Sequence, residues 1–157
     1  MNPLTPRGFP VEEYERRTAA AQTMLAEQGL NARLVCTEPE VRYFTGFFTP
    51  FWQSPTRPWF VVLPLEGRPM AVIPSIGSTL MRGTWVQDIR TWPAPRPDDD
   101  GVSLLAATLH EAAGTAGRIG VPMGHETHLR MPLTDWDDLQ EATTDILHVD
   151  ADRKSGV

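Results

Sequence analysis

The sequence predicts an α/β fold of three layers, in which a mixed β-sheet lies between flanking helices. Short apolar segments alternate along the chain with longer segments whose apolar residues recur every three or four positions, as in layered α/β domains. Two apolar segments, Trp59–Leu63 and Met70–Pro74, are separated by the turn Glu66–Pro69, so they form an antiparallel hairpin within that sheet. The 157 residues, 41% apolar and 22% charged, suit one globular domain.

The first predicted helix covers residues 10–28 and packs on the sheet. Pro10 suits the first helical position, since its missing N–H would have no partner there, and Gly29 ends the helix. Glu12 and Glu13 follow in the first turn, where negative charge is favourable. The apolar stripe consists of Val11, Tyr14, Ala21, Met24 and Leu25, with the polar Thr18 at its edge.

The segments after this helix alternate between strands and short helices. We expect a buried strand at 32–37, one or two helical turns at 38–44 before Gly46, then the hairpin and a short helix at 76–82. A strand at 85–92 and a proline-rich loop at 93–101 follow.

The second part of the chain contributes two more helices and two more strands. A helix at 102–114 carries Leu104, Leu105, Leu109 and Ala112 on a common face. Residues 117–121 form a turn that leads into a strand. Residues 132–144 carry a helix that starts at a Thr134 cap. The last strand is expected at 146–149.

Composition excludes several classes of partner. A net charge of −6 with scattered basic residues argues against nucleic acid, because phosphate neutralisation requires clustered Lys and Arg. No segment approaches the ~18 consecutive apolar residues of a membrane span, and the N-terminus lacks the apolar segment of a signal peptide. The single cysteine, Cys36, fits a reducing compartment, so we expect a cytoplasmic protein.

No motif in the chain predicts catalysis or a metal site. His125 and His128 are one residue short of the H-E-x-x-H spacing and lie between Gly124 and Pro132, which favours a solvated loop. Cys36 lies inside an apolar strand, which indicates a buried, inert thiol. The central strands carry no acid, which counts against a carboxylate-dependent nuclease. We therefore expect no catalytic residue and no cofactor in this chain.

The segment 47–58 is the one that looks functional. It holds four large aromatic side chains, three prolines and one arginine between two ordered elements. A surface loop this apolar favours a partner or ligand. For Phe47 and Phe48 packing on the core is an equal alternative, whereas Phe51, Trp52 and Arg57 favour an interface or ligand role.

The run Glu40-Val41-Arg42-Tyr43-Phe44-Thr45-Gly46-Phe47 resembles a motif of the creatinase/prolidase family, which includes Xaa-Pro aminopeptidases and other pita-bread metallohydrolases. Arg118–Val121 is similar to the segment that follows the second long helix in this family, and the order of elements resembles its N-terminal domain over about residues 10–150. The resemblance implies a ribonuclease-H-like motif, a tail at 1–9 and the start of a linker at 151–157. The linker would lead to a catalytic domain absent from this chain.

The resemblance also implies a function. Family members hold two metal ions, here expected as Mn, Zn or Co, in the catalytic domain and hydrolyse Xaa-Pro peptides or related C–N bonds. In a homodimer, an aromatic and an arginine from the N-terminal loop reach the neighbouring active site. Arg57 matches that arginine, whose planar fork can bind a carboxylate, and the aromatic is left open between Phe51 and Trp52. The alternative is a free-standing small-molecule-binding or dimerisation module without enzyme activity.

Overall fold

The computed structural model describes residues 8–54 and 57–152. Most of the predicted tail at 1–9 and of the predicted linker at 151–157 therefore lies outside the described residues. The helices, in chain order, are α1 (Val11–Glu27), α2 (Glu38–Thr45), α3 (Ser78–Arg82), α4 (Val102–Ala113) and α5 (Leu133–Ala142). Two 3₁₀ helices are η1 (Pro50–Gln53) and η2 (Ser75–Gly77). The strands are β1 (Ala32–Val35), β2 (Phe60–Pro64), β3 (Met70–Pro74), β4 (Asp88–Trp92), β5 (Arg118–Val121) and β6 (Leu147–Asp150).

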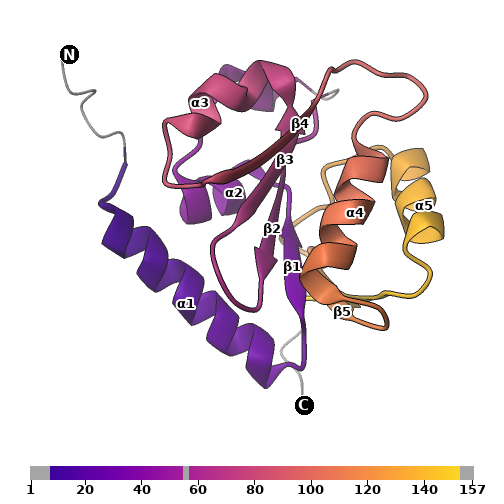
Figure 1. The fold of residues 1–157 in the computed structure, drawn as a ribbon, viewed down its shortest axis with the longest axis horizontal. Coiled ribbons are helices and arrows are strands. Elements are labelled where there is room, and N and C mark those ends of the chain that lie inside the picture. The colour runs from indigo at the N-terminus through magenta and orange to yellow at the C-terminus, as the bar shows by residue number, and fades with distance from the viewer. Residues whose placement is uncertain (1–7, 55–56, 153–157) are drawn as a thin grey trace.

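The strands form one mixed sheet in the order β4-β3-β2-β1-β5-β6. The hairpin β2–β3 is antiparallel, and β1 also pairs with β2 in the antiparallel sense. The other neighbouring strands, β3 with β4, β1 with β5 and β5 with β6, are parallel. Helices cover both faces, with α4 and α5 on one side and α1, α2 and α3 on the other (Figure 1). The predicted three-layer α/β fold is confirmed.

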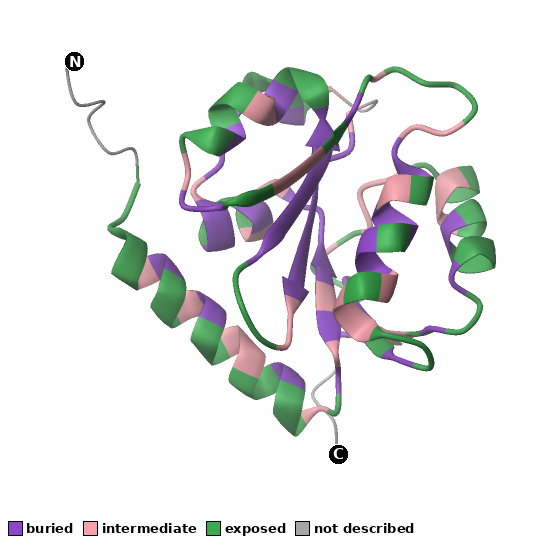
Figure 2. Cartoon of the chain, in the orientation of Figure 1, coloured by how far each residue is buried: buried purple, intermediate pink, exposed green. Residues whose placement is uncertain are grey.

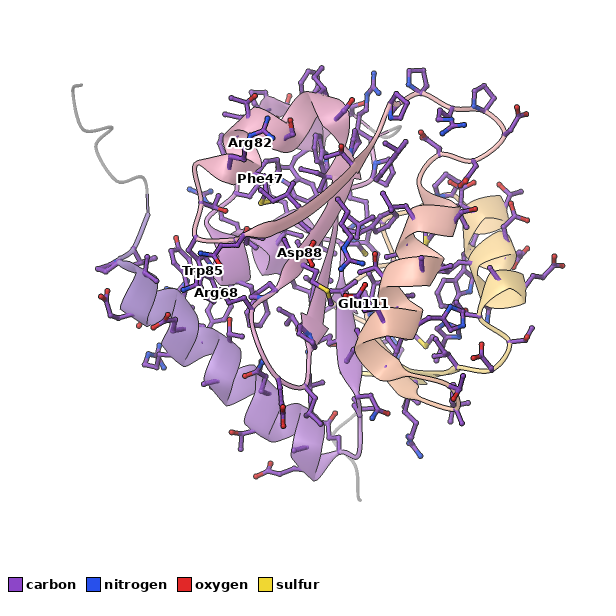
Figure 3. The ribbon with its side chains drawn as sticks, in the orientation of Figure 1. Phe47, Arg68, Arg82, Trp85, Asp88 and Glu111 are labelled. Carbon is purple, nitrogen blue, oxygen red and sulfur yellow. The ribbon has the colours of Figure 1, made fainter. Side chains whose placement is uncertain are left out.

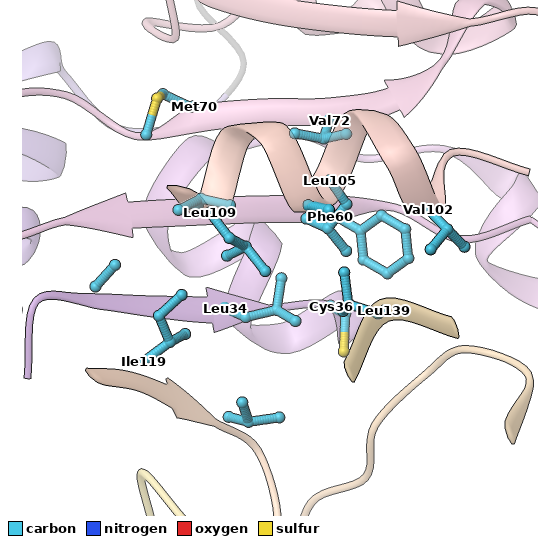
Figure 4. Packing of buried hydrophobic residues seen from close by; sticks show 14 of the residues in the cluster. Leu34, Cys36, Phe60, Met70, Val72, Val102, Leu105, Leu109, Ile119 and Leu139 are labelled. Carbon is cyan, nitrogen blue, oxygen red and sulfur yellow. The ribbon is translucent and has the colours of Figure 1, made fainter. Parts of the chain in front are cut away.

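Two hydrophobic clusters occupy the two faces of the sheet, because successive residues of a strand point to opposite faces. In β2, Phe60 and Val62 belong to the cluster beneath α4 and α5, while Val61 and Leu63 belong to the opposite cluster. Figure 4 shows the first cluster, where Leu105 and Leu109 of α4 pack over these strands. In Figure 2 the central strands are buried almost throughout, whereas the outward faces of α1 and α5 are exposed.

The buried face of α1 differs from the prediction at three positions, the first of which is Val11, which is 43% exposed at the start of the helix. Thr18 is 3% exposed and lies within the buried face, whereas Met24 is 56% exposed. Tyr14, Thr18 and Leu25 share one face at helical spacing, and Met24 lies about 100° around the helix from Leu25. The predicted placement of Met24 in the core is therefore wrong. Pro10 precedes the helix in an extended conformation and is not its first helical residue.

The start of α5 also differs from the prediction. The helix begins at Leu133, with Pro132 in an extended conformation before it, and no side chain caps its first turn. Thr134 is the second residue of the helix, so the predicted Thr134 cap is wrong. Proline is suited to the position before Leu133 because its fixed φ is compatible with the residue that leads into a helix. The remaining predicted helices and strands are present, with ends shifted by a few residues.

Candidate functional site

The segment 47–58 begins where α2 ends at Gly46. Gly46 has a φ of 77°, and an added Cβ would lie 2.5 Å from the Tyr14 hydroxyl oxygen, so glycine is required on both counts. Phe47 is 1% exposed and packs on Trp59, with ring centroids 5.3 Å apart. Phe48 is 52% exposed. Of the two phenylalanines left open by the sequence, Phe47 belongs to the core and Phe48 lies on the surface.

The short helix η1 places Phe51 and Trp52 in opposite environments. Thr49 caps η1, with its hydroxyl oxygen accepting from the Phe51 N–H at 3.3 Å. Phe51 is 41% exposed, whereas Trp52 is 8% exposed and packs against Trp59 with centroids 6.2 Å apart. Phe51 is thus the more accessible aromatic of the pair.

Arg57 is half-buried at the end of the segment, just before β2. Its backbone carbonyl accepts a hydrogen bond from the Arg130 guanidinium. Within residues 8–54 and 57–152, its own guanidinium makes no hydrogen bond and no ion pair. The backbone carbonyls of Trp52 and Arg57 thus both accept hydrogen bonds from Arg130. The role of Phe51, Trp52 and Arg57 in substrate binding stays a prediction.

Arg130 is the residue of this region that the sequence analysis missed. Its guanidinium donates to the carbonyl oxygens of Trp52 at 3.2 Å, of Ser54 at 2.5 Å and of Arg57. The guanidinium carbon also lies 5.0 Å from the Trp52 ring centroid, within the range of a cation–π contact. Burial lowers the pKa of Arg130, yet a guanidinium stays charged at any ordinary pH. The position of an arginine between Leu129 and Met131 is the only local signal in the sequence.

Cys36 is buried, as predicted, but it lies just beyond the end of β1 and not within the strand. It is fully buried, and its sulfur accepts from the Arg130 backbone N–H at 3.3 Å. Burial raises the pKa of the Cys36 thiol to about 12, so the thiol is neutral and not nucleophilic near pH 7. Its place in the molecule is structural.

His125 and His128 lie on a non-helical segment between β5 and α5, which confirms the predicted loop. A hollow of about 610 Å³ borders this segment and is lined by residues 123–127 with Asp150 and Asp152. Asp152 is engaged there by Arg33 at 3.4 Å and by the Gly124 N–H at 3.1 Å. Among the described residues, no three His, Cys, Asp or Glu side chains are grouped to bind a metal ion.

A second hollow, of about 650 Å³, lies between the β2–β3 turn and α4. Asp88 and Glu111 border it (Figure 3) and bind the Arg90 guanidinium at 2.8 Å and 2.6 Å. Arg90 lowers the pKa of both carboxyl groups, so they stay ionised and join β4 to α4. This arrangement is that of a structural ion pair.

The profile of the creatinase/prolidase N-terminal domain matches residues 17–152, which is most of the chain. The chain belongs to the creatinase/prolidase N-terminal domain family. The motif around Gly46 that carries the resemblance thus has a structural role in this family member, since it ends α2 over Tyr14 and leads into the candidate segment. No curated protein matches the sequence.

Solved structures with the same fold include a dipeptidase, PepE, from Mycobacterium ulcerans, 24% identical with a TM-score of 0.67 over 91% of this chain and 35% of that chain. A prolidase from Thermococcus sibiricus is 17% identical, with a TM-score of 0.72 over the same two shares. The N-terminal domain of a putative metallopeptidase from Corynebacterium diphtheriae is 16% identical, with a TM-score of 0.62 over 88% of this chain and 95% of that chain. This chain therefore spans about a third of the length of the dipeptidase and of the prolidase.

In the part of the chain that the structure describes, no helix has both the length and the apolar composition to cross a bilayer.

Proposed function

We propose that this chain is the non-catalytic N-terminal domain of a metal-dependent hydrolase that cleaves Xaa-Pro peptides or a related C–N bond. One observation carries the proposal. The chain belongs to the creatinase/prolidase N-terminal domain family, and its fold matches 35% of a dipeptidase chain and of a prolidase chain. The catalytic domain would be joined to the C-terminal side of this one, and the protein would act in the cytoplasm.

Within this proposal the segment 50–57 controls access to the substrate in a homodimer. The Arg57 guanidinium would bind a substrate carboxylate of the neighbouring subunit, a task for which its planar pair of N–H donors is suited. Its lack of any hydrogen bond or ion pair among the described residues supports this role. The exposed fraction of Phe51, 41% against 8% for Trp52, favours Phe51 as the aromatic that meets the substrate.

The metal ions of the proposed hydrolase do not fit this domain. No group of three ligand side chains exists among the described residues, and His125 and His128 lie on a loop that does not align them. We propose that the catalytic domain holds the expected pair of Mn, Zn or Co ions.

The test compares this chain with the complete protein that carries it. Both are assayed with an Xaa-Pro dipeptide in the presence of Mn²⁺, Zn²⁺ or Co²⁺. Hydrolysis by the complete protein only is the expected result. Hydrolysis by this chain alone, or one-to-one metal binding in calorimetry that His125→Ala with His128→Ala abolishes, would overturn the proposal. A reading frame without a catalytic domain would point instead to the free-standing binding or dimerisation module.

A further inference from the structure

We infer that Arg130 is a positioning residue that restrains the backbone at Trp52, Ser54 and Arg57 and so sets the placement of Phe51 and Arg57. The conformational part of the inference concerns this domain alone. Its consequence for substrate binding rests on the function proposed above.

Arg130 contacts the backbone of the segment at three residues. Its guanidinium donates to the carbonyl oxygens of Trp52, Ser54 and Arg57. It also lies over the Trp52 indole, 5.0 Å from the ring centroid. Phe51 directly precedes the first of these carbonyls, and Arg57 carries the last. One side chain thus restrains the backbone directly after Phe51 and at Arg57, the two residues proposed to meet the substrate.

The backbone that carries Arg130 is itself held in place. Its N–H donates to the Cys36 sulfur at 3.3 Å, just beyond the end of β1. The neighbouring side chains, Leu129 and Met131, pack against the hydrophobic cluster beneath α4 and α5. The backbone of Arg130 is therefore held in place, so less conformational entropy is lost when its guanidinium binds the segment.

The chemistry of the contact requires an arginine. Three carbonyl oxygens accept from one planar group, and five N–H donors in a rigid fork can serve them at once. Lysine offers a single ammonium at the end of a flexible stem and cannot reproduce the same arrangement. In the described part of the chain, Arg130 forms no ion pair with a carboxylate, so its donors are committed to the segment.

Hydrogen exchange on this chain tests the inference directly. The amides of residues 51–54 and 57 are followed in wild type, Arg130→Ala and Arg130→Lys. Arg68→Ala is the matched control, since Arg68 also lies over an indole, 5.2 Å from the Trp85 centroid, and donates to one backbone carbonyl (Figure 3). The strand amides of β2 and β3 report whether each variant keeps its fold.

Exchange of these amides should rise by about tenfold or more in Arg130→Ala and by a smaller factor in Arg130→Lys, because the restraint on local opening is lost. Arg68→Ala should leave it unchanged, and exchange in β2 and β3 should not change in any variant. Unchanged exchange at 51–54 and 57 in Arg130→Ala would overturn the inference. If Arg130→Ala does not fold, Arg130→Lys decides by the same criterion.

The kinetic arm separates this inference from the proposed function. In the complete protein, Arg130→Lys should raise the KM for an Xaa-Pro dipeptide several-fold with kcat nearly unchanged, the pattern of lost ground-state binding. Faster hydrogen exchange with an unchanged KM would show that Arg130 restrains the segment without affecting substrate binding, which overturns the second part of the inference. Unchanged hydrogen exchange would overturn the positioning role of Arg130 itself, whatever the kinetics of Arg57→Ala show for the proposed function.

Discussion

The indole of Trp52 packs against that of Trp59, with ring centroids 6.2 Å apart and planes tilted by 55°. Trp59 is fully buried and also contacts Phe47, so a cluster of three aromatic side chains holds both ends of segment 47–58 to the sheet. The Arg130 guanidinium also lies over the Trp52 ring, 5.0 Å from its centroid. Trp52 thus contacts both Trp59 and Arg130, while Phe48 and Phe51 are the exposed aromatic side chains of the segment.

Replacing Leu25 by alanine should destabilise the domain by about 2–5 kcal/mol, the usual loss for a buried leucine. Leu25 is 4% exposed on the inner face of α1. Met24→Ala is the matched control, because the neighbouring Met24 is 56% exposed and should lose less than about 0.5 kcal/mol. Urea titration of the two variants measures both values, and equal losses would contradict the orientation of α1.

Replacing Gly77 by alanine should destabilise the domain by about 1–3 kcal/mol through overpacking. Gly77 has an ordinary φ of −88°, so backbone strain is not the reason. An added Cβ would lie 2.4 Å from the Trp59 ring, which has little room to move because it is fully buried and packs against Phe47 and Trp52. The measurement is urea unfolding, and a change near zero would show that Trp59 shifts freely.

The stability that Cys36 contributes should depend on pH above about 9. Burial raises the pKa of the folded thiol from 9.0 to about 12, so between these values the unfolded chain loses a proton that the folded chain keeps. Stability then falls as the pH rises, by at most about 1.4 kcal/mol per pH unit. The free energy of unfolding of wild type, relative to Cys36→Ala, should therefore drop between about pH 8 and about pH 10. A difference that does not depend on pH would mean that the thiol is accessible.

Local patterns were enough to predict most of the fold. The β2–β3 hairpin follows from two apolar runs around a short turn, and α4 follows from its apolar spacing. The buried face of α1 is less easily predicted. Met24 is more apolar than Thr18, but the helical spacing from Tyr14 and Leu25 places Thr18 inward and Met24 outward. At these two positions helical spacing, and not hydrophobicity, determines which side chain is buried.

The candidate site was only half predictable. The composition of segment 47–58 predicts a functional region, but which of its aromatic side chains are exposed depends on the η1 turn and on the position of Trp59. The contacts of Arg130 join residues 73 to 78 positions apart in the chain. No local pattern encodes such a contact, since it depends on how the segment between β5 and α5 crosses the end of β1.

We propose that this domain serves a hydrolase by presenting Arg57 to its substrate. The most direct measurement is kcat/KM of the complete protein for an Xaa-Pro dipeptide, compared between wild type and Arg57→Ala, with Arg68→Ala as the control for loss of a surface arginine. We expect a fall of roughly 10- to 100-fold for Arg57→Ala, because a charge-assisted hydrogen bond of about 1.5–3 kcal/mol is lost, and little change for Arg68→Ala. Equal kcat/KM in wild type and Arg57→Ala would contradict it.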